Sequence, residues 1–129
     1  MSLNNSFLIG VVGPCAAGKS TLVSGLSRHG YRARHIAQEH SYVPAMWRKI
    51  TDPDLLIYLD VSYPVTIQRR RLDWTMKDYE TQITRLSHAR QNADLYIHTD
   101  DLSIQQILDI VLGFLADRGV VSSDASLPG

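Results

Sequence analysis

A phosphate-binding pattern, G-x-x-x-x-G-K-S/T, matches residues 13–20, which read GPCAAGKS. Gly13 and Gly18 permit backbone angles and close approaches that a Cβ atom would block. Successive N–H groups of such a loop can turn inward around an anion, at the positive end of the following helix. Lys19 can place a charge on the β- and γ-phosphates, and the Ser20 hydroxyl is a suitable Mg²⁺ ligand. The pattern therefore predicts a site for the phosphates of a nucleotide.

The predicted nucleotide-binding residues are consecutive: Gly13, Pro14, Cys15, Ala16, Ala17, Gly18, Lys19, Ser20 and Thr21. Thr21 is expected to add a contact to the α-phosphate. Cys15 is the only cysteine of the chain, so two interpretations of it are open. It is either a redox-sensing thiol or a small residue that the loop tolerates, and the lack of a second cysteine to resolve an oxidised form favours tolerance.

A second group of candidate residues lies in AQEHSYVPAMW, at 37–47. Glu39 is the carboxylate best placed to orient a Mg²⁺-bound water or to accept a proton from an acceptor hydroxyl, and His40 could act as a base. Gln38 could orient a nucleophile. The alternative is that these residues form an ordinary polar loop. Two interpretations are open for the apolar residues of this segment. Tyr42, Met46 and Trp47 can cover the sheet, or the rings of Tyr42 and Trp47 can stack on a planar acceptor.

Asp60 and the arginine run at 69–71 complete the charged candidates. Asp60 follows the apolar run LLIYL, which makes it a candidate Mg²⁺-side carboxylate acting through water. Three consecutive arginines on one helix are about 100° apart, so one or two of Arg69, Arg70 and Arg71 can face a nucleotide while another faces solvent. The alternative for the run is a solvated helix face.

The elements that must position these residues alternate between strands and helices. Apolar runs predict strands at about 7–12, 31–36, 55–60 and 94–99, of which 31–36 alternates in polarity and is expected near a sheet edge. Helices are predicted from Gly18 or Lys19 to 29, from Pro64 to about 72, from a capping box at Thr75, and from Ser103 to about 119. The fold class is therefore α/β, a three-layer αβα arrangement with a mostly parallel sheet of about four strands.

The last two helices are each predicted to bury one apolar face. The inward residues are expected to be Met76, Tyr79, Ile83 and Leu86 in the third helix, and Ile104, Ile107, Leu108, Val111, Leu112 and Leu115 in the fourth. Ligands of a parallel sheet bind at the carboxyl ends of its strands, and the phosphate-binding pattern follows the first strand directly.

Composition limits the class of protein. The 129 residues suit a single domain, 1–129, with loose termini at about 1–5 and 121–129. Thirteen basic and thirteen acidic residues balance, which argues against bulk binding to nucleic acid. No apolar run is long enough to span a membrane and no leader pattern is present, so a cytoplasmic protein is expected. The guanine signature N/T-K-x-D is missing, which disfavours a GTPase switch.

The chain resembles the small P-loop kinases of nucleosides, nucleotides and other metabolites. Their phosphate loop is similar to GPCAAGKSTL, their pre-lid strand and helix to PDLLIYLDVSYPVTIQRRR (53–71), and their last strand and helix to ADLYIHTDDLSIQQILDIVLGFL (93–115). The resemblance implies a P-loop NTPase fold that binds ATP and Mg²⁺, with Arg69, Arg70 or Arg71 opening a lid that Arg85 or Arg90 closes. It also implies a structural or capping role for Asp60, and places Asp100 and Asp101 beside the adenine.

The chain departs from these kinases in two ways. Only about two dozen residues, 31–54, stand where they place an acceptor-binding region, and their acidic motif beside the phosphate loop is missing. Three functions are therefore weighed: transfer of the ATP γ-phosphoryl group to a small acceptor, nucleotide binding without catalysis that signals to a protein partner, and slow ATP hydrolysis in which Glu39 or Asp60 positions water.

Overall fold

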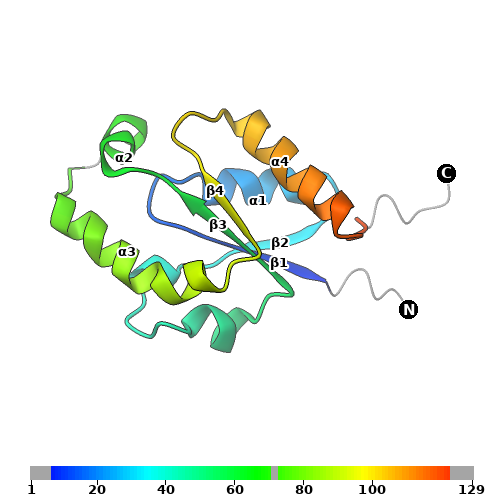
Figure 1. Ribbon diagram of the computed structural model, residues 1–129, viewed down its shortest axis with the longest axis horizontal. Coiled ribbons are helices and arrows are strands. Elements are labelled where there is room, and N and C mark those ends of the chain that lie inside the picture. Colours follow the sequence, from blue (N-terminus) through cyan, green and yellow to red (C-terminus); the bar gives the residue numbers. More distant parts are fainter. Residues whose placement is uncertain (1–6, 71–72, 123–129) are drawn as a thin grey trace.

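The computed structural model describes residues 7–70 and 73–122 (Figure 1). Four strands form one sheet in the order β2-β1-β3-β4, and all neighbouring pairs are parallel. The strands are β1 (Leu8–Val12), β2 (Arg32–His35), β3 (Leu55–Asp60) and β4 (Leu95–His98). Central β1 is buried along its whole length and β3 everywhere except its last residue, whereas β2 is largely exposed at one edge. The sheet, and the edge position of the polar strand, are as the sequence predicts.

Helices lie on both faces of this sheet (Figure 1). They are α1 (Lys19–Arg28), α2 (Tyr63–Arg70), α3 (Met76–Gln91) and α4 (Ile104–Asp117). Helices α1 and α4 pack on one face, and α3 packs on the other. Both predicted capping boxes are present, at Thr75 with Asp78 and at Ser103 with Gln106. The α/β class is thus confirmed, and the arrangement is compatible with three layers.

The two faces have separate apolar cores. On one face, side chains of β1 and β3 pack against α1 and α4; its fully buried members include Ile9, Val11, Leu26, Ile57, Leu59, Val111 and Leu115. On the other, the core comprises Val12, Ile36, Trp47, Leu56, Tyr58, Leu86 and Ala89. Two short helical segments, η2 (Gln38–His40) and η3 (Trp47–Thr51), connect β2 to β3, and η3 supplies Trp47 to this second core.

Two residues expected on buried helix faces are exposed. Met76 is 47% exposed and Ile104 is 66% exposed. Each begins its helix, and the first turn of α3 lies beyond the edge of the sheet (Figure 1), so no strand covers it. Leu86 is buried as predicted, and the other buried positions of α3 are Gln82 and Ala89, at the spacing of one helix stripe.

Some sequence predictions fall partly outside the described residues. The helix predicted from Pro64 to about 72 is observed as α2 up to Arg70, and residues 71–72 are not described. Most of the termini predicted to be loose are not described either; at the carboxyl end Val121 is 45% exposed, whereas Ser122 is buried. Within the described ranges, no helix has both the length and the hydropathy that crossing a bilayer requires.

Candidate functional site

The loop between β1 and α1 has the backbone conformation that its glycines predict. Gly13 has φ 157°, and a Cβ atom there would lie 2.1 Å from the carbonyl oxygen of Leu59 in the neighbouring strand. Gly18 has φ 94°, and Ala16 adopts a left-handed φ of 69° between them. The Ala17 N–H donates to the Pro14 oxygen at 3.2 Å and closes the turn. Only glycine fits at position 13, because β1 and β3 are adjacent there.

The first turn of α1 offers unpaired donors. Gly18 is the N-cap and has no side chain to cap the helix, and the first intrahelical bond runs from the Leu22 N–H to the Gly18 oxygen at 3.0 Å. Within the described chain, no acceptor is found for the backbone N–H groups of residues 19–21. Such groups, at the positive end of a helix, form a site for an anion.

These donors border a cavity of about 360 Å³. It is lined by the loop, the first turn of α1, η2 and the ends of β2 and α2: Cys15, Ala16, Gly18, Lys19, Ser20, Thr21, His35, Glu39, His40 and Arg70. The structure therefore brings together the phosphate-binding pattern, Glu39 and Arg70, which are far apart in the sequence.

Lys19 and Glu39 form a buried ion pair at this cavity. The Lys19 ammonium lies 2.9 Å from Glu39 Oε2, and it also donates to the carbonyl oxygens of Gly13 at 2.7 Å and Pro14 at 3.0 Å. Both side chains are less than 10% exposed. The other carboxylate oxygen, Glu39 Oε1, is buried and has no hydrogen-bond partner among the described residues. The pair thus has one unsatisfied acceptor, on a residue that also lines the cavity.

The segment that carries Glu39 is held in place by Gln38. Its side chain, which is fully buried, donates to the Val43 oxygen at 2.9 Å and the Arg85 oxygen at 3.2 Å, and accepts from the Trp47 N–H at 2.8 Å. All of these partners are backbone groups. The prediction that Gln38 orients a nucleophile is therefore wrong, because its amide is used to fold residues 38–47.

The aromatic residues of this segment divide into one that is buried and one that is exposed. Trp47 is 3% exposed and its indole N–H donates to His88 Nδ1 at 3.1 Å, so it covers the sheet as expected. Tyr42 is 85% exposed, so the expectation that it also covers the sheet is wrong. The Arg85 guanidinium stacks on the Tyr42 ring at 4.4 Å and donates to the Glu39 carbonyl oxygen at 3.3 Å. Arg85 thus supports the backbone of Glu39, and its side chain is not part of the cavity lining.

The arginines predicted to form a lid have different surroundings. Arg69 donates to the Ala16 oxygen at 3.1 Å, and to the hydroxyl and carbonyl oxygens of Thr99 at 2.9 and 2.5 Å. It therefore ties the loop between β1 and α1 to the end of β4. Arg70 lines the cavity, and Arg71 lies outside the described residues. Arg90 stacks on Tyr96 at 4.9 Å, outside the cavity lining.

Asp60 is bonded to protein groups and does not line the cavity. Its Oδ1 accepts from the Val61 N–H at 2.9 Å, and its Oδ2 accepts from the Tyr96 hydroxyl. Burial, this hydrogen bond and the Asp60 charge raise the pKa of Tyr96 to about 12. Of the two interpretations of Asp60, its contacts match the structural one.

Asp100 extends this network across the end of the sheet. Its Oδ1 accepts from the Ser62 N–H at 2.9 Å, and His98 Nε2 lies 3.2 Å from its Oδ2. Burial alone would raise the pKa of Asp100, but the Ser62 hydrogen bonds and the His98 charge outweigh it and lower the pKa below 3.8. The carboxylate thus fixes the start of α2 in its charged form.

This lowered pKa predicts a dependence of stability on pH. Because the folded state favours the ionised form of Asp100, its contribution is present above the unfolded pKa and is lost as pH falls through the folded pKa. We expect Asp100→Asn to reduce the free energy of unfolding at pH 7, and the difference from wild type to shrink towards pH 3. Urea unfolding at both pH values measures this, with Asp101→Asn as the control. An equal difference at both pH values would contradict it.

The sequence patterns did not identify Gln82, which supports the loop from α3. Its Oε1 accepts from the Cys15 N–H at 3.0 Å, and its Nε2 donates to Cys15 Sγ at 3.1 Å. The only signal in the sequence is its position four and seven residues before Leu86 and Ala89, which places an amide on the buried stripe. Thr99, the fully buried partner of Arg69, gave no comparable signal.

Replacing Gln82 tests its role. We expect Gln82→Leu to destabilise the protein by about 1–3 kcal/mol, because the partly buried Cys15 N–H loses its acceptor. Denaturant unfolding measures the change. The same substitution at exposed Gln91, at the end of α3, is expected to change stability by less than about 0.5 kcal/mol. Equal effects at the two positions would contradict the proposed support of the loop.

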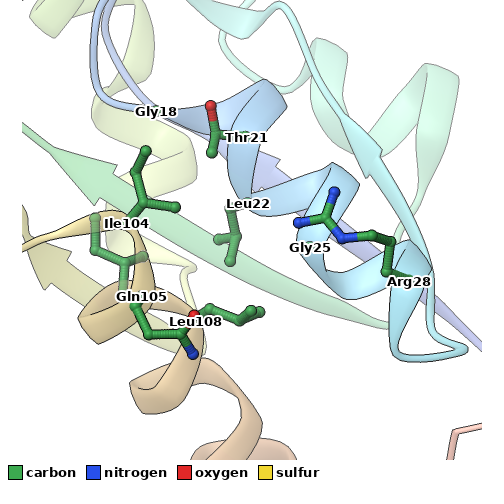
Figure 2. Close-up of a pocket in the computed structure, with 9 residues that line it drawn as sticks. Gly18, Thr21, Leu22, Gly25, Arg28, Ile104, Gln105 and Leu108 are labelled. Atoms are coloured by element: carbon green, nitrogen blue, oxygen red, sulfur yellow. The ribbon is translucent and has the colours of Figure 1, made fainter.

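An apolar groove between α1 and α4 continues from the loop (Figure 2). Thr21 and Leu22 of α1 face Ile104 and Leu108 of α4 across a space of about 70 Å³, with Gln105 at its rim (Figure 2). The exposed Ile104 therefore borders this groove instead of the sheet.

The fold and the site thus define an α/β protein with a glycine-containing loop, a polar cavity and an adjoining apolar groove at the carboxyl end of β1. Comparison of the chain with models of known protein families gives no match, and neither does comparison with curated proteins.

Proposed function

We propose that this protein is a P-loop NTPase of the kinase type, which binds ATP with Mg²⁺ and transfers the γ-phosphoryl group to a small acceptor. One observation carries the proposal: Lys19 and a Glu39 carboxylate with one unpartnered oxygen border the same cavity as the unpaired N–H groups of α1. This combination supplies positive groups for a phosphate chain and a carboxylate for an acceptor.

The loop and the groove suggest how the nucleotide lies. The N–H groups of residues 19–21 are donors for the phosphates, with Lys19 at the β- and γ-phosphates and Thr21 at the α-phosphate. The nucleobase then extends into the groove, where Leu22 and Ile104 offer apolar surface and the Gln105 amide offers hydrogen bonds. The missing guanine signature favours adenine.

The residues of the cavity fit a hard cation. The Ser20 and Thr21 hydroxyls supply oxygen ligands of the kind that Mg²⁺ prefers, and the Glu39 carboxylate would accept a hydrogen bond from a Mg²⁺-bound water. Ser20 would hold the ion together with phosphate oxygens. When bound, Mg²⁺ neutralises charge on the phosphates.

The reaction can be assigned to residues of this chain. The Lys19 ammonium exchanges its contact with Glu39 for phosphate oxygens, which leaves Glu39 free to act as a base. The acceptor hydroxyl oxygen bonds to the γ-phosphorus, the bond from that phosphorus to the β,γ-bridging oxygen breaks, and the hydroxyl proton passes to Glu39. Arg70 and Lys19 neutralise the charge on the transferring group, and ADP leaves.

The test is ADP formation from ATP and Mg²⁺ with pooled nucleosides, nucleotides and small alcohols. We expect acceptor-dependent ADP in the wild type and in Lys77→Ala, a control at an exposed lysine of α3. ADP no higher than in Lys19→Ala with every acceptor pool would exclude transfer.

Nucleotide binding without catalysis is the second candidate, and the contacts of Asp60 favour it. Because Asp60 is bonded to Tyr96 and the Val61 N–H, Glu39 is the one carboxylate that lines the cavity in the described residues. This candidate predicts saturable ATP or ADP binding by calorimetry with negligible turnover. It also predicts a protein partner whose binding depends on whether a nucleotide is bound. ADP release that does not depend on an acceptor would instead indicate slow hydrolysis.

A further inference from the structure

Three side chains with different metal-binding groups meet at the mouth of the cavity. The Cys15 sulfur, one Glu39 carboxylate oxygen and one His40 ring nitrogen all lie within 4.8 Å of one another. Cys15 comes from the loop after β1, whereas Glu39 and His40 come from η2, so the fold brings the cluster together. All three residues line the cavity, which leaves room for a further ligand.

We propose that these residues form a binding site for a thiophilic divalent cation, with Zn²⁺ as the best fit. Thiolate and imidazole ligands favour Zn²⁺ over Mg²⁺ and Ca²⁺, which prefer oxygen. Three protein ligands with an open fourth position are typical of zinc sites that exchange a water or a substrate. This site does not rest on the proposed phosphoryl transfer, since it needs no nucleotide.

The unsatisfied oxygen of Glu39 is an independent indication of a cation. Glu39 Oε1 is buried without a hydrogen-bond partner among the described residues, and the Lys19 ammonium contacts the other oxygen, Oε2, at 2.9 Å. Burial of an unpaired carboxylate oxygen is unfavourable. A bound Zn²⁺ would satisfy Oε1 and leave the Lys19 contact in place.

The distances require only a small rearrangement. Ligand atoms about 2.0–2.3 Å from a tetrahedral Zn²⁺ lie about 3.3–3.8 Å apart. The three ligand atoms of the cluster already lie within 4.8 Å of one another, and His40 Nε2 is 3.8 Å from Glu39 Oε2, the neighbouring oxygen of the same carboxylate. The His40 side chain is 61% exposed, so it can turn towards Cys15 without disturbing the core. The Gln82 amide donates to Cys15 Sγ at 3.1 Å, which orients the sulfur.

The charges of the site also suit a divalent cation. On binding, the Cys15 thiol releases its proton to solvent and the thiolate bonds to the metal. The thiolate and Glu39 then offset the charge of Zn²⁺, while the Lys19 ammonium remains bonded to the carbonyl oxygens of Gly13 and Pro14.

Calorimetry with Zn²⁺ and absorption spectroscopy with Co²⁺, on the full chain with its thiol kept reduced, test this site. We expect one Zn²⁺ per chain and a thiolate-to-cobalt charge-transfer band. Cys15→Ser should abolish the band, and Cys15→Ser and His40→Ala should each weaken Zn²⁺ binding by at least about 10-fold. His29→Ala, at an exposed histidine outside the cavity, should leave both unchanged.

Two results would overturn the proposal. One is the absence of saturable Zn²⁺ binding by the wild type. The other is Zn²⁺ affinity that Cys15→Ser and His40→Ala leave unchanged, which would place the ion elsewhere. Both variants are expected to fold, because serine is close to cysteine in size and His40 is exposed. Neither result bears on ATP binding, so the nucleotide proposal is tested separately.

Discussion

Lys19→Ala is expected to weaken ATP binding by about 100-fold or more. The substitution removes the ammonium that would contact the phosphates, and charge-assisted hydrogen bonds contribute about 1.5–3 kcal/mol each. It also leaves the Glu39 carboxylate unopposed beside the phosphate chain. Displacement of a fluorescent nucleotide measures the affinity, with Lys77→Ala as the matched control on the exposed face of α3.

The same substitution destabilises the protein, so binding and folding must be separated. Removing one member of a buried ion pair costs about 3–5 kcal/mol, because the remaining charge is uncompensated. The double variant Lys19→Ala/Glu39→Gln removes both charges and is expected to recover most of that stability while ATP binding stays weak. If the double variant bound ATP as tightly as the wild type, Lys19 would be a structural residue and not a phosphate ligand.

Gly13→Ala is expected to be the most destabilising single change in the loop, by about 3 kcal/mol or more. A Cβ atom would lie 2.1 Å from the Leu59 carbonyl oxygen, and this oxygen belongs to a central strand that cannot move away. Overpacking costs about 1–3 kcal/mol, and strained backbone at positive φ costs about 1–3 kcal/mol more. Thermal or denaturant unfolding measures the loss.

Two other glycines provide matched controls for this effect. At Gly18, φ is 94° but nothing lies within 4 Å of an added Cβ, so Gly18→Ala is expected to cost about 1–2 kcal/mol from backbone strain alone. At Gly113, on the exposed side of α4, the site is open, and Gly113→Ala should stabilise the helix by about 0.5–1 kcal/mol. If Gly13→Ala cost no more than Gly18→Ala, the contact with Leu59 would not constrain the loop.

The elements that follow from local patterns were predictable from the sequence. The central strands are continuous apolar runs, and the boundaries of β3 match the prediction residue by residue. The capping boxes at Thr75 and Ser103 depend on residues three positions apart, so the sequence contains them in full. The loop at 13–20 is equally local, and its glycines adopt the positive φ values that the pattern requires.

The contacts that arrange the site join residues distant in sequence, which is why local patterns missed them. Gln82 reaches Cys15 across 67 positions, and Arg69 reaches Thr99 across 30. The hydrogen bond of Tyr96 to Asp60 depends on the pairing of β3 with β4, which makes the two residues diagonal neighbours on adjacent strands. Periodicity also overstated the buried faces, since it cannot show that Met76 and Ile104 lie where no strand covers them.

The central claim is that a nucleotide binds by its phosphates in the loop between β1 and α1. Titration of the ¹⁵N-labelled protein with ADP and Mg²⁺, followed through backbone amide resonances, tests it most directly. The predicted result is that the largest shifts fall on Ala16 to Thr21, with further shifts at Ile104 and Gln105 in the groove. Saturation without shifts at Ala16 to Thr21, or no saturable change at all, would contradict the assignment of this loop as the phosphate site.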